Sequence, residues 1–404
     1  MNEAPAGAGR QLAAASIAVV LGLAPWFSAT AVVPAMAAEW ELTAPAASWL
    51  TMAVQIGFVA GTLVSAAWML ADRWSAQRLA AWSAALAAAS TAAIAWWAHS
   101  GATAIALRAL TGVALAGVYP PAIKLVAGWW RHGRGLAIGV LIGALSLGSA
   151  APHLIRVLWP FGEWRALMMA AAISAAGAAL VFAIAVRPGP FQAPSSPLDR
   201  HALGAVIRDR AVMLATAGYL GHMWELYAMW SWMLAFWAAI AVARAYAPAI
   251  PALMTFATLA IGGIGCVIGG WMADRAGRTA VTIGAMIISG ACAIVIGPAS
   301  RGPVILLVAI TLVWGLSVVA DSAQFSACVT ELVPAEYTGT ALTLQTSLGF
   351  LLTMVSIRSI PLWVAQWGWT YAFMPLAAGP LLGSIAMWRL RRLPASARLA
   401  GGAR

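Results

Sequence analysis

The sequence predicts an all-α integral membrane protein whose twelve transmembrane helices form two parallel, pseudo-symmetric six-helix bundles. Of its 404 residues, 63% are hydrophobic and only 9% are charged, whereas a soluble globular domain carries about 25% charged residues. The apolar residues form long runs with short polar connections between them, and short motifs recur at half the chain length. These three observations exclude a water-soluble enzyme.

Each predicted helix is an apolar run of the length that a bilayer requires, roughly 20 residues. Charged residues, Pro or Gly bound each run, and six runs lie in each half of the chain. The first run is longer than the apolar core of a signal peptide, which favours a retained span. In order, the predicted spans cover 13–36, 46–70, 79–98, 102–126, 136–158, 165–186, 211–238, 247–272, 280–299, 303–329, 339–362 and 368–388.

The basic residues predict the orientation, because Lys and Arg accumulate in cytoplasmic loops. With both termini in the cytoplasm, 17 of the 23 basic residues fall on the cytoplasmic side, while the first outer loop carries Glu39 and Glu41. The net charge of +11 comes from short clusters between spans rather than from one patch, so we expect no nucleic-acid partner. We expect a multi-pass protein of a bacterial cytoplasmic (inner) membrane with cytoplasmic N- and C-termini.

An internal repeat divides the chain into two halves. Ala71-Asp72-Arg73 follows the second span, and Ala273-Asp274-Arg275 follows the eighth span 202 positions later. Because each half has an even number of spans, the halves share one topology, are related by an axis along the membrane normal and enclose a central cleft. The predicted parts are an N-terminal bundle at 1–186, a cytoplasmic linker at 187–210 and a C-terminal bundle with a short tail at 211–404.

The loop after the eighth span carries a family motif. Gly270-Trp271-Met272-Ala273-Asp274-Arg275-Ala276-Gly277-Arg278 resembles the loop signature of the major facilitator superfamily, Gly-x-Leu-Ala-Asp-Arg-x-Gly-Arg. Arg108-Ala109-Leu110-Thr111-Gly112 is similar to its fourth-helix pattern, Arg-x-x-x-Gly, which is associated with proton coupling. The resemblance covers the whole chain and implies that spans one, four, seven and ten line the cleft. It also implies gating loops built from Asp72, Arg73, Gly270, Asp274, Arg275, Gly277 and Arg278.

Small residues repeat at every fourth position in three spans, a spacing that lets helices approach closely. The resemblance implies that spans two, five, eight and eleven form the seam between the two halves. The stripes expected in this seam are Gly57 with Gly61, Gly135 with Gly139 and Gly143, and Gly265 with Gly269.

Four titratable side chains lie deep within spans, namely Arg108, His222, Glu225 and Asp321. A charge at this depth costs at least about 2.5–3.5 kcal/mol and therefore needs a partner or water. His222 and Glu225 are three residues apart, so they share one helix face. We expect His222, Glu225 and Asp321 to gain and lose protons during alternating access, and Arg108 to attract a negatively charged solute. An alternative is that Arg108 pairs with Glu225 or Asp321 as a structural lock.

Further side chains are expected to bind the solute beside Arg108. Two of them, Arg156 and Arg358, have an alternative in which they reach the lipid headgroups, and His153 has one as a hydrogen-bonded core residue. The expected solute-binding residues besides Arg108 are Trp26, Tyr119, His153, Arg156, Trp232, Trp314 and Arg358.

The sequence therefore predicts a monomeric, proton-coupled secondary transporter of a small organic solute, anionic because of the in-span arginines. Its expected partners are the solute, protons and the lipid bilayer. An alternative is proton-driven efflux of amphipathic or cationic compounds, which Trp232, Trp314 and the acidic Glu225 and Asp321 favour. A lipid-modifying membrane enzyme and a transporter-like sensor are further alternatives. We expect no enzymatic activity, no cofactor and no metal, since His222 and Glu225 lack a third ligand at suitable spacing.

Overall fold

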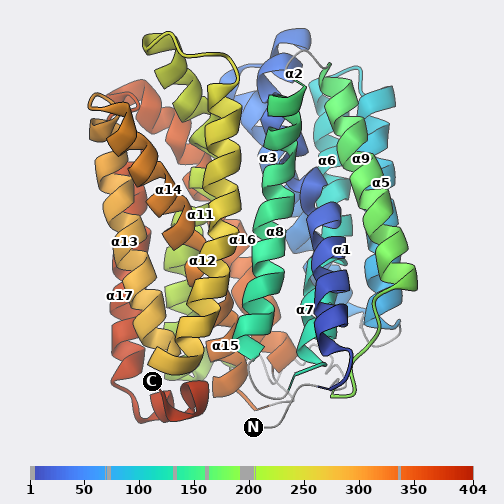
Figure 1. Ribbon diagram of the computed structural model, residues 1–404, viewed down its shortest axis with the longest axis vertical. Coiled ribbons are helices and arrows are strands. Elements are labelled where there is room, and N and C mark those ends of the chain that lie inside the picture. The colour runs from blue at the N-terminus through green and yellow to red at the C-terminus, as the bar shows by residue number, and fades with distance from the viewer. Residues whose placement is uncertain are drawn as a thin grey trace.

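The computed structural model describes residues 5–68, 70, 74–130, 134–159, 163–191, 204, 206–334 and 338–403. Every regular element within these residues is a helix, and the longer helices run side by side along the long axis of the molecule (Figure 1). Both chain ends lie at the lower end in Figure 1, as an even number of spans requires. We call this the terminal end and the opposite one the distal end.

The first half of the chain forms six segments of membrane-spanning length, two of which are interrupted. They are α1 (Ala8–Ser28) with η1 (Thr30–Val32) and α2 (Val33–Glu39), α3 (Ala44–Ala67), α5 (Ala76–Trp97), α6 (Gly101–Leu115) with α7 (Tyr119–Ala127), α8 (Arg134–Leu158) and α9 (Trp164–Ile184).

The second half repeats this plan. It contains α11 (Arg210–Ala243), α12 (Ile250–Ala276), α13 (Arg278–Ala299), α14 (Val304–Ala320) with α15 (Ser322–Leu332), α16 (Thr338–Trp367), η3 (Met374–Ala377) with α17 (Ala378–Arg391), and η4 (Pro394–Gly402). Among the described residues, eleven segments are long and apolar enough to cross a membrane. The twelfth is η3 with α17, whose α-helix has 14 residues and packs on α13 (Figure 1). The predicted twelve-helix fold is confirmed.

The fourth and tenth spans, predicted as continuous, are each broken in the middle. α6 ends at Leu115 and α7 begins at Tyr119, where Pro120 and Pro121 suit a helix start but not a helix interior. The tenth span breaks at Asp321, which lies 202 positions after Tyr119. The two breaks are therefore equivalent in the repeat. Interrupted membrane helices free backbone groups near the midplane, where transport proteins place their binding sites.

Two helix pairs carry most of the contact between the halves, α8 with α12 and α3 with α16. In the first pair, a Cβ added to Gly139 would lie 2.6 Å from the carbonyl oxygen of Cys266, and one added to Gly143 would lie 2.8 Å from that of Gly263. Only glycine allows backbones this close. The α8 stripe therefore lies in the seam, as expected.

The other two glycine stripes were expected in the same seam, and this prediction is wrong. A Cβ at Gly57 of α3 would lie 1.9 Å from the carbonyl oxygen of Ala109 in α6, within the first half. A Cβ at Gly265 of α12 would lie 2.0 Å from that of Leu316 in α14, within the second half. These glycines serve packing inside each half, because the tightest helix pairs there also need small residues.

Candidate functional site

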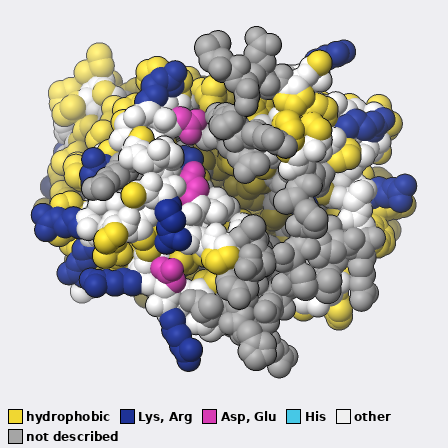
Figure 2. All heavy atoms as spheres, turned by 90° about the horizontal axis from the view of Figure 1, so that it is seen from below, with side chains coloured by type: hydrophobic (Ala, Val, Ile, Leu, Met, Phe, Trp, Pro, Cys, Tyr) yellow, Lys and Arg dark blue, Asp and Glu magenta, His cyan; other side chains and the backbone are white. Residues whose placement is uncertain are grey.

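The molecule is hollowed at its terminal end. Figure 2 views it from that end and shows a depression near the centre with hydrophobic side chains in its depth. Further along the helices, four aromatic rings fill the space between the halves. Ring centroids are 5.1 Å apart for Trp26 and Phe58, 4.7 Å for Phe58 and Phe350, and 5.1 Å for Phe350 and Tyr227. Each half supplies two rings, so this cluster packs the two halves against each other.

Hydrogen bonds between α3 and α16 hold the distal side together. Thr353 donates its hydroxyl to Gln55 Oε1 at 2.7 Å. Nearer the distal start of α3, Arg358 Nη1 donates to the carbonyl oxygen of Pro45 at 3.2 Å and to Ser48 Oγ at 3.3 Å. The two halves are therefore held together on the distal side, while the terminal end is hollowed.

Glu225, in the middle of α11, is a buried carboxylate with neutral partners. It is 1% exposed. Trp314 Nε1 donates to its Oε1 at 2.7 Å from α14, and Ser289 Oγ donates to its Oε2 at 2.7 Å from α13. Among the described residues, no Lys, Arg or His lies within ion-pair distance of Glu225. A buried ion without a counter-charge is costly, so a proton is the natural way to neutralise this group.

His222 and Asp321 form a second titratable pair one helical turn nearer the terminal end. His222 Nδ1 lies 2.9 Å from Asp321 Oδ1, and both side chains are almost completely buried. The contact does not count as a hydrogen bond, since neither Asp321 Oδ1 nor His222 Nε2 has a hydrogen-bond partner among the described residues. The ring of Phe325 packs at 5.4 Å from the imidazole. His222 and Glu225 are therefore neighbours on α11, but they form two separate sites with different partners.

Arg108 is completely buried and binds backbone carbonyl groups of its own half. Its Nε donates to Leu50 O of α3 at 3.0 Å, its Nη1 donates to Pro25 O at 2.5 Å, and its Nη2 donates to Trp26 O. Ser28 Oγ also accepts from Nη1 at 3.4 Å. The guanidinium therefore caps the end of α1, where carbonyl groups lack helical partners and a cation is favourable. Neither Glu225 nor Asp321 is among its partners.

The remaining expected solute-binding residues lie at different depths. Tyr119 is partly buried at the start of α7. Trp232 donates Nε1 to Ile357 O at 3.0 Å and borders a cavity of about 220 Å³ between α2, α3, α11 and α16. His153 is fully buried in α8 and neither ring nitrogen has a hydrogen-bond partner. Arg156 is partly buried near the end of α8. The structure therefore brings Trp314 to Glu225 and His222 to Asp321, but it does not gather the arginines around one site.

Several functional candidates carry no charge and were missed in the sequence. Ser289 hydrogen-bonds Glu225. Gln55 and Gln345 are buried, and the amide nitrogen of each, with the amide oxygen of Gln345, lacks a partner within the described part of the chain. Buried polar atoms are rarely left unpaired, so water or a solute is needed here. A glutamine inside an apolar span was the available signal, and it is weaker than that of a charged residue.

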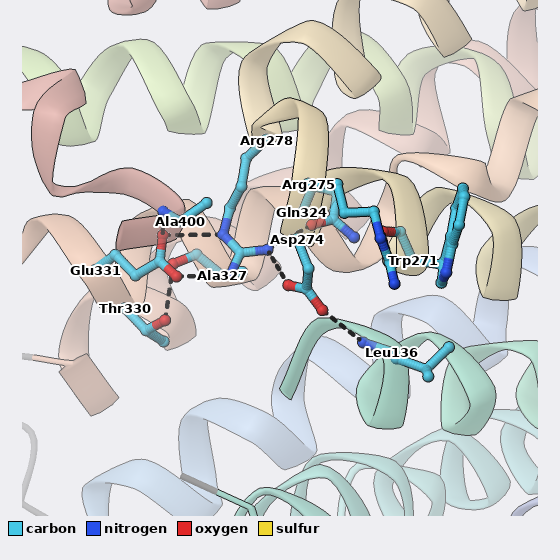
Figure 3. A network of polar contacts seen from close by, with 10 residues as sticks. All are labelled: Leu136, Trp271, Asp274, Arg275, Arg278, Gln324, Ala327, Thr330, Glu331 and Ala400. Carbon is cyan, nitrogen blue, oxygen red and sulfur yellow. Dashed lines mark hydrogen bonds and ion pairs between the residues drawn. The ribbon is translucent and has the colours of Figure 1, made fainter. Parts of the chain in front are cut away.

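At the terminal end, Asp274 connects the two halves (Figure 3). Its Oδ2 accepts a hydrogen bond from the backbone N–H of Leu136 at 3.3 Å, in the first turn of α8. An anion is stabilised at a helix N-terminus. Gly270 also contacts α8, since a Cβ there would lie 2.6 Å from the carbonyl oxygen of Gly135.

The other predicted gating residues shape the corner between α12 and α13. Gly277 has φ 92°, a left-handed conformation that favours glycine. Arg278 lies 3.7 Å from Asp274 Oδ1 and forms a bidentate pair with Glu331 at 2.6 and 2.9 Å (Figure 3). Arg275 instead folds back over the ring of Trp271 at 4.2 Å. Asp72 and Arg73, the first-half counterparts, lie outside the described residues.

Comparisons with known proteins agree with this architecture. The family model described as Major Facilitator Superfamily matches residues 15–357 of the chain. An MFS-type transporter of Aspergillus terreus, pytF, is 27% identical over 177 residues, which are 43% of this chain and 58% of that protein. The chain therefore aligns with just over half the length of this relative.

Solved structures share the fold at low identity. The proton:xylose symporter XylE bound to 6-bromo-6-deoxy-D-glucose superposes with a TM-score of 0.73 at 14% identity, over 94% of this chain and 96% of that one. A partially occluded inward-open conformation of the xylose transporter XylE from E. coli gives 0.73 at 12% identity, over 95% and 99%. Since the superfamily match covers most of the sequence, this multi-pass membrane protein belongs to the major facilitator superfamily of transporters.

Proposed function

We propose that the protein is a proton-coupled secondary transporter of a small organic solute, and not an enzyme. It works as a monomer in a bacterial cytoplasmic membrane with its termini in the cytoplasm. The bundles at 1–186 and 211–404, joined by the linker at 187–210, rock about the solute. The terminal-end hollow is then the cytoplasmic opening, and the aromatic cluster of Trp26, Phe58, Tyr227 and Phe350 is the closed outer side.

The observation that carries the proposal is the surroundings of Glu225. Its two oxygens meet a Trp314 N–H and a Ser289 hydroxyl, and no cation among the described residues balances its charge. Ser289 Oγ also lies 3.3 Å from Met286 O. The hydroxyl can therefore donate to the ionised carboxylate, or it can turn to Met286 O and accept a hydrogen bond from the neutral acid. Both protonation states find hydrogen bonds, as a reversible proton site requires.

The position of Glu225 also suits coupling. It bridges α11, α13 and α14, so a change in its charge acts on three helices of one half. The tenth span is interrupted at Asp321, and this carboxylate meets His222 of the same α11. A proton on either site changes the attraction between α11 and the tenth span. A ligand or proton that favours one arrangement in this way shifts the alternating-access equilibrium.

The solute class rests on a balance of two observations. The in-span arginines favour an anion, but Arg108 and Arg358 are bound to carbonyl and hydroxyl oxygens of the protein itself. The amide nitrogens of Gln55 and Gln345, together with the amide oxygen of Gln345, have no partner among the described residues and suit a neutral solute rich in hydroxyl groups. The sugar named for XylE is of this kind. We keep the anion as the first class to test and the neutral polar solute as the second.

The test is uptake into proteoliposomes with an imposed pH gradient. A panel of organic anions, sugars and organic cations is offered to the purified full-length protein, with and without a protonophore. We expect accumulation of one class that collapses when the protonophore is added. The efflux alternative predicts that cationic amphipathic compounds move instead, against the direction of proton flow.

Glu225→Gln is the informative variant, and Glu163→Gln, an exposed carboxylate outside the predicted spans, is its matched control. We expect gradient-driven accumulation to be lost in the first and kept in the second. Accumulation that is insensitive to the protonophore in the wild-type protein would refute proton coupling.

A further inference from the structure

A groove runs between α13 and α17 on the outer surface of the second half. It encloses about 630 Å³. Small residues open it, including Gly290 and Ala291 on α13 and Ala378 on α17, and branched apolar side chains such as Ile287 and Leu381 form its walls. In a membrane this surface faces acyl chains, so the groove is a slot for a hydrocarbon chain.

The length of the groove matches one leaflet. On α13 its lining extends from Ile283 to Ile294, and on α17 from Ala378 to Arg389. Both stretches span about 16 Å at 1.5 Å per residue. Half of a hydrocarbon core of roughly 30 Å is about 15 Å. The groove therefore fits one acyl chain of the leaflet at the terminal end.

Polar groups occur where the headgroup of such a lipid would lie. Arg389 lines the groove at its terminal end and is exposed, and its guanidinium has no ion pair or hydrogen bond with the described residues. Its neighbour Arg392 stacks on Trp388 at 3.6 Å. Toward the membrane centre, the groove is also lined by Ser384, whose buried hydroxyl has no hydrogen-bond partner in the described part of the chain. A glycerophospholipid has the same order, with its phosphate outermost and its ester oxygens closer to the membrane centre.

We propose that the groove binds one anionic glycerophospholipid of the terminal-end leaflet. Its phosphate lies on Arg389, an ester oxygen accepts from Ser384, and one acyl chain fills the slot between α13 and α17. Basic pockets between helices on the cytoplasmic side recognise anionic headgroups. The choice of an anionic lipid follows from the free cation, since a zwitterionic headgroup brings its own positive charge to Arg389.

A second groove provides an internal contrast. It encloses about 590 Å³ between α1, α8 and α12, and Lys, Arg, Asp and Glu are absent from its lining. It can hold acyl chains, but it offers no charged group to a headgroup. Of these two grooves, only the one between α13 and α17 is therefore expected to select an anionic lipid.

The test is native mass spectrometry of the full-length protein in detergent with equal amounts of phosphatidylglycerol and phosphatidylcholine. The wild-type protein should retain one phosphatidylglycerol in preference. Arg389→Gln should reduce this preference about fivefold, the effect of one basic residue at a membrane surface. Ala291→Trp, at an exposed position, should fill the slot and remove the bound lipid while Arg389 stays in place. Arg301→Gln, an exposed arginine at the distal end, is the matched control and should change nothing.

Two results would overturn the proposal. One is equal retention of the two lipids by the wild-type protein, which is the behaviour of unspecific boundary lipid. The other is an undiminished preference in Arg389→Gln. Because the readout is lipid retention, it stands apart from the outcome of the transport experiments.

Discussion

Replacing Arg108 tests whether its charge serves the solute or the fold. Arg108→Met removes the donors to the carbonyl oxygens of Leu50, Pro25 and Trp26. Ser28 Oγ still donates to Pro25 O at 2.9 Å, so the cost falls on the other two carbonyl oxygens, at about 1–3 kcal/mol for each buried acceptor that is left without a partner. Relief from burying the cation offsets part of this cost. The net expectation is a loss of about 1–3 kcal/mol of stability, which is within the usual range for one destabilising substitution.

The assay is thermal unfolding of the purified protein in detergent, followed by size-exclusion chromatography. Arg108→Lys should also destabilise the protein, because one ammonium group cannot reach carbonyl groups spread across a planar fork. Arg301→Met, at an exposed site, controls for loss of a charge and should change stability by less than about 0.5 kcal/mol. An Arg108→Met protein that unfolds like the wild type but fails to bind solute would refute the structural role.

Three further results are expected. Gly139→Leu should block the approach of α8 to Cys266 of α12, 2.6 Å from the added Cβ, so that transport falls more than tenfold while the protein still inserts into membranes. Asp274→Asn should weaken the contact with the start of α8 and raise proteolysis at the terminal end, and an unchanged digestion pattern would count against the contact. The hydrogen bond from Arg165 lowers the pKa of Glu39 below the ordinary value of a glutamate. The small stabilisation that this contact gives is therefore present at pH values above that ordinary pKa and is lost as the pH falls. Glu39→Gln should lower the unfolding midpoint at neutral pH, and this difference from the wild type should vanish between about pH 5 and pH 3.

The sequence predicted the architecture because apolar length and the repeat are properties of the chain alone. It could not predict the partners of Arg108, since these are backbone carbonyl groups, two of them near the end of α1 at Ser28 and one on α3. Trp314 and Asp321 are seven residues apart in one span, and both contact α11, Trp314 at Glu225 and Asp321 at His222. The partner that each side chain meets depends on how the helices pack, which the sequence alone does not show.

The neutral residues were harder to predict for another reason. Burying an amide costs less free energy than burying a charge, so a glutamine in an apolar span is a weaker signal than a charged residue. Gln55 joins α3 to α16 across the two halves. Neither amide atom of Gln345 has a partner among the described residues, which leaves both of its N–H donors and its acceptor oxygen unmet. Only packing reveals that these groups are enclosed, because a glutamine in a span can also lie at a wetted surface.

The most direct test of the central claim compares two kinds of solute movement in the same Glu225→Gln vesicles. One assay measures accumulation driven by a pH gradient, and the other measures exchange of labelled for unlabelled solute without a gradient. If Glu225 is the proton site, accumulation is abolished and exchange continues, because the carrier still alternates but no longer moves a proton. Accumulation at the wild-type level in this variant would contradict the account.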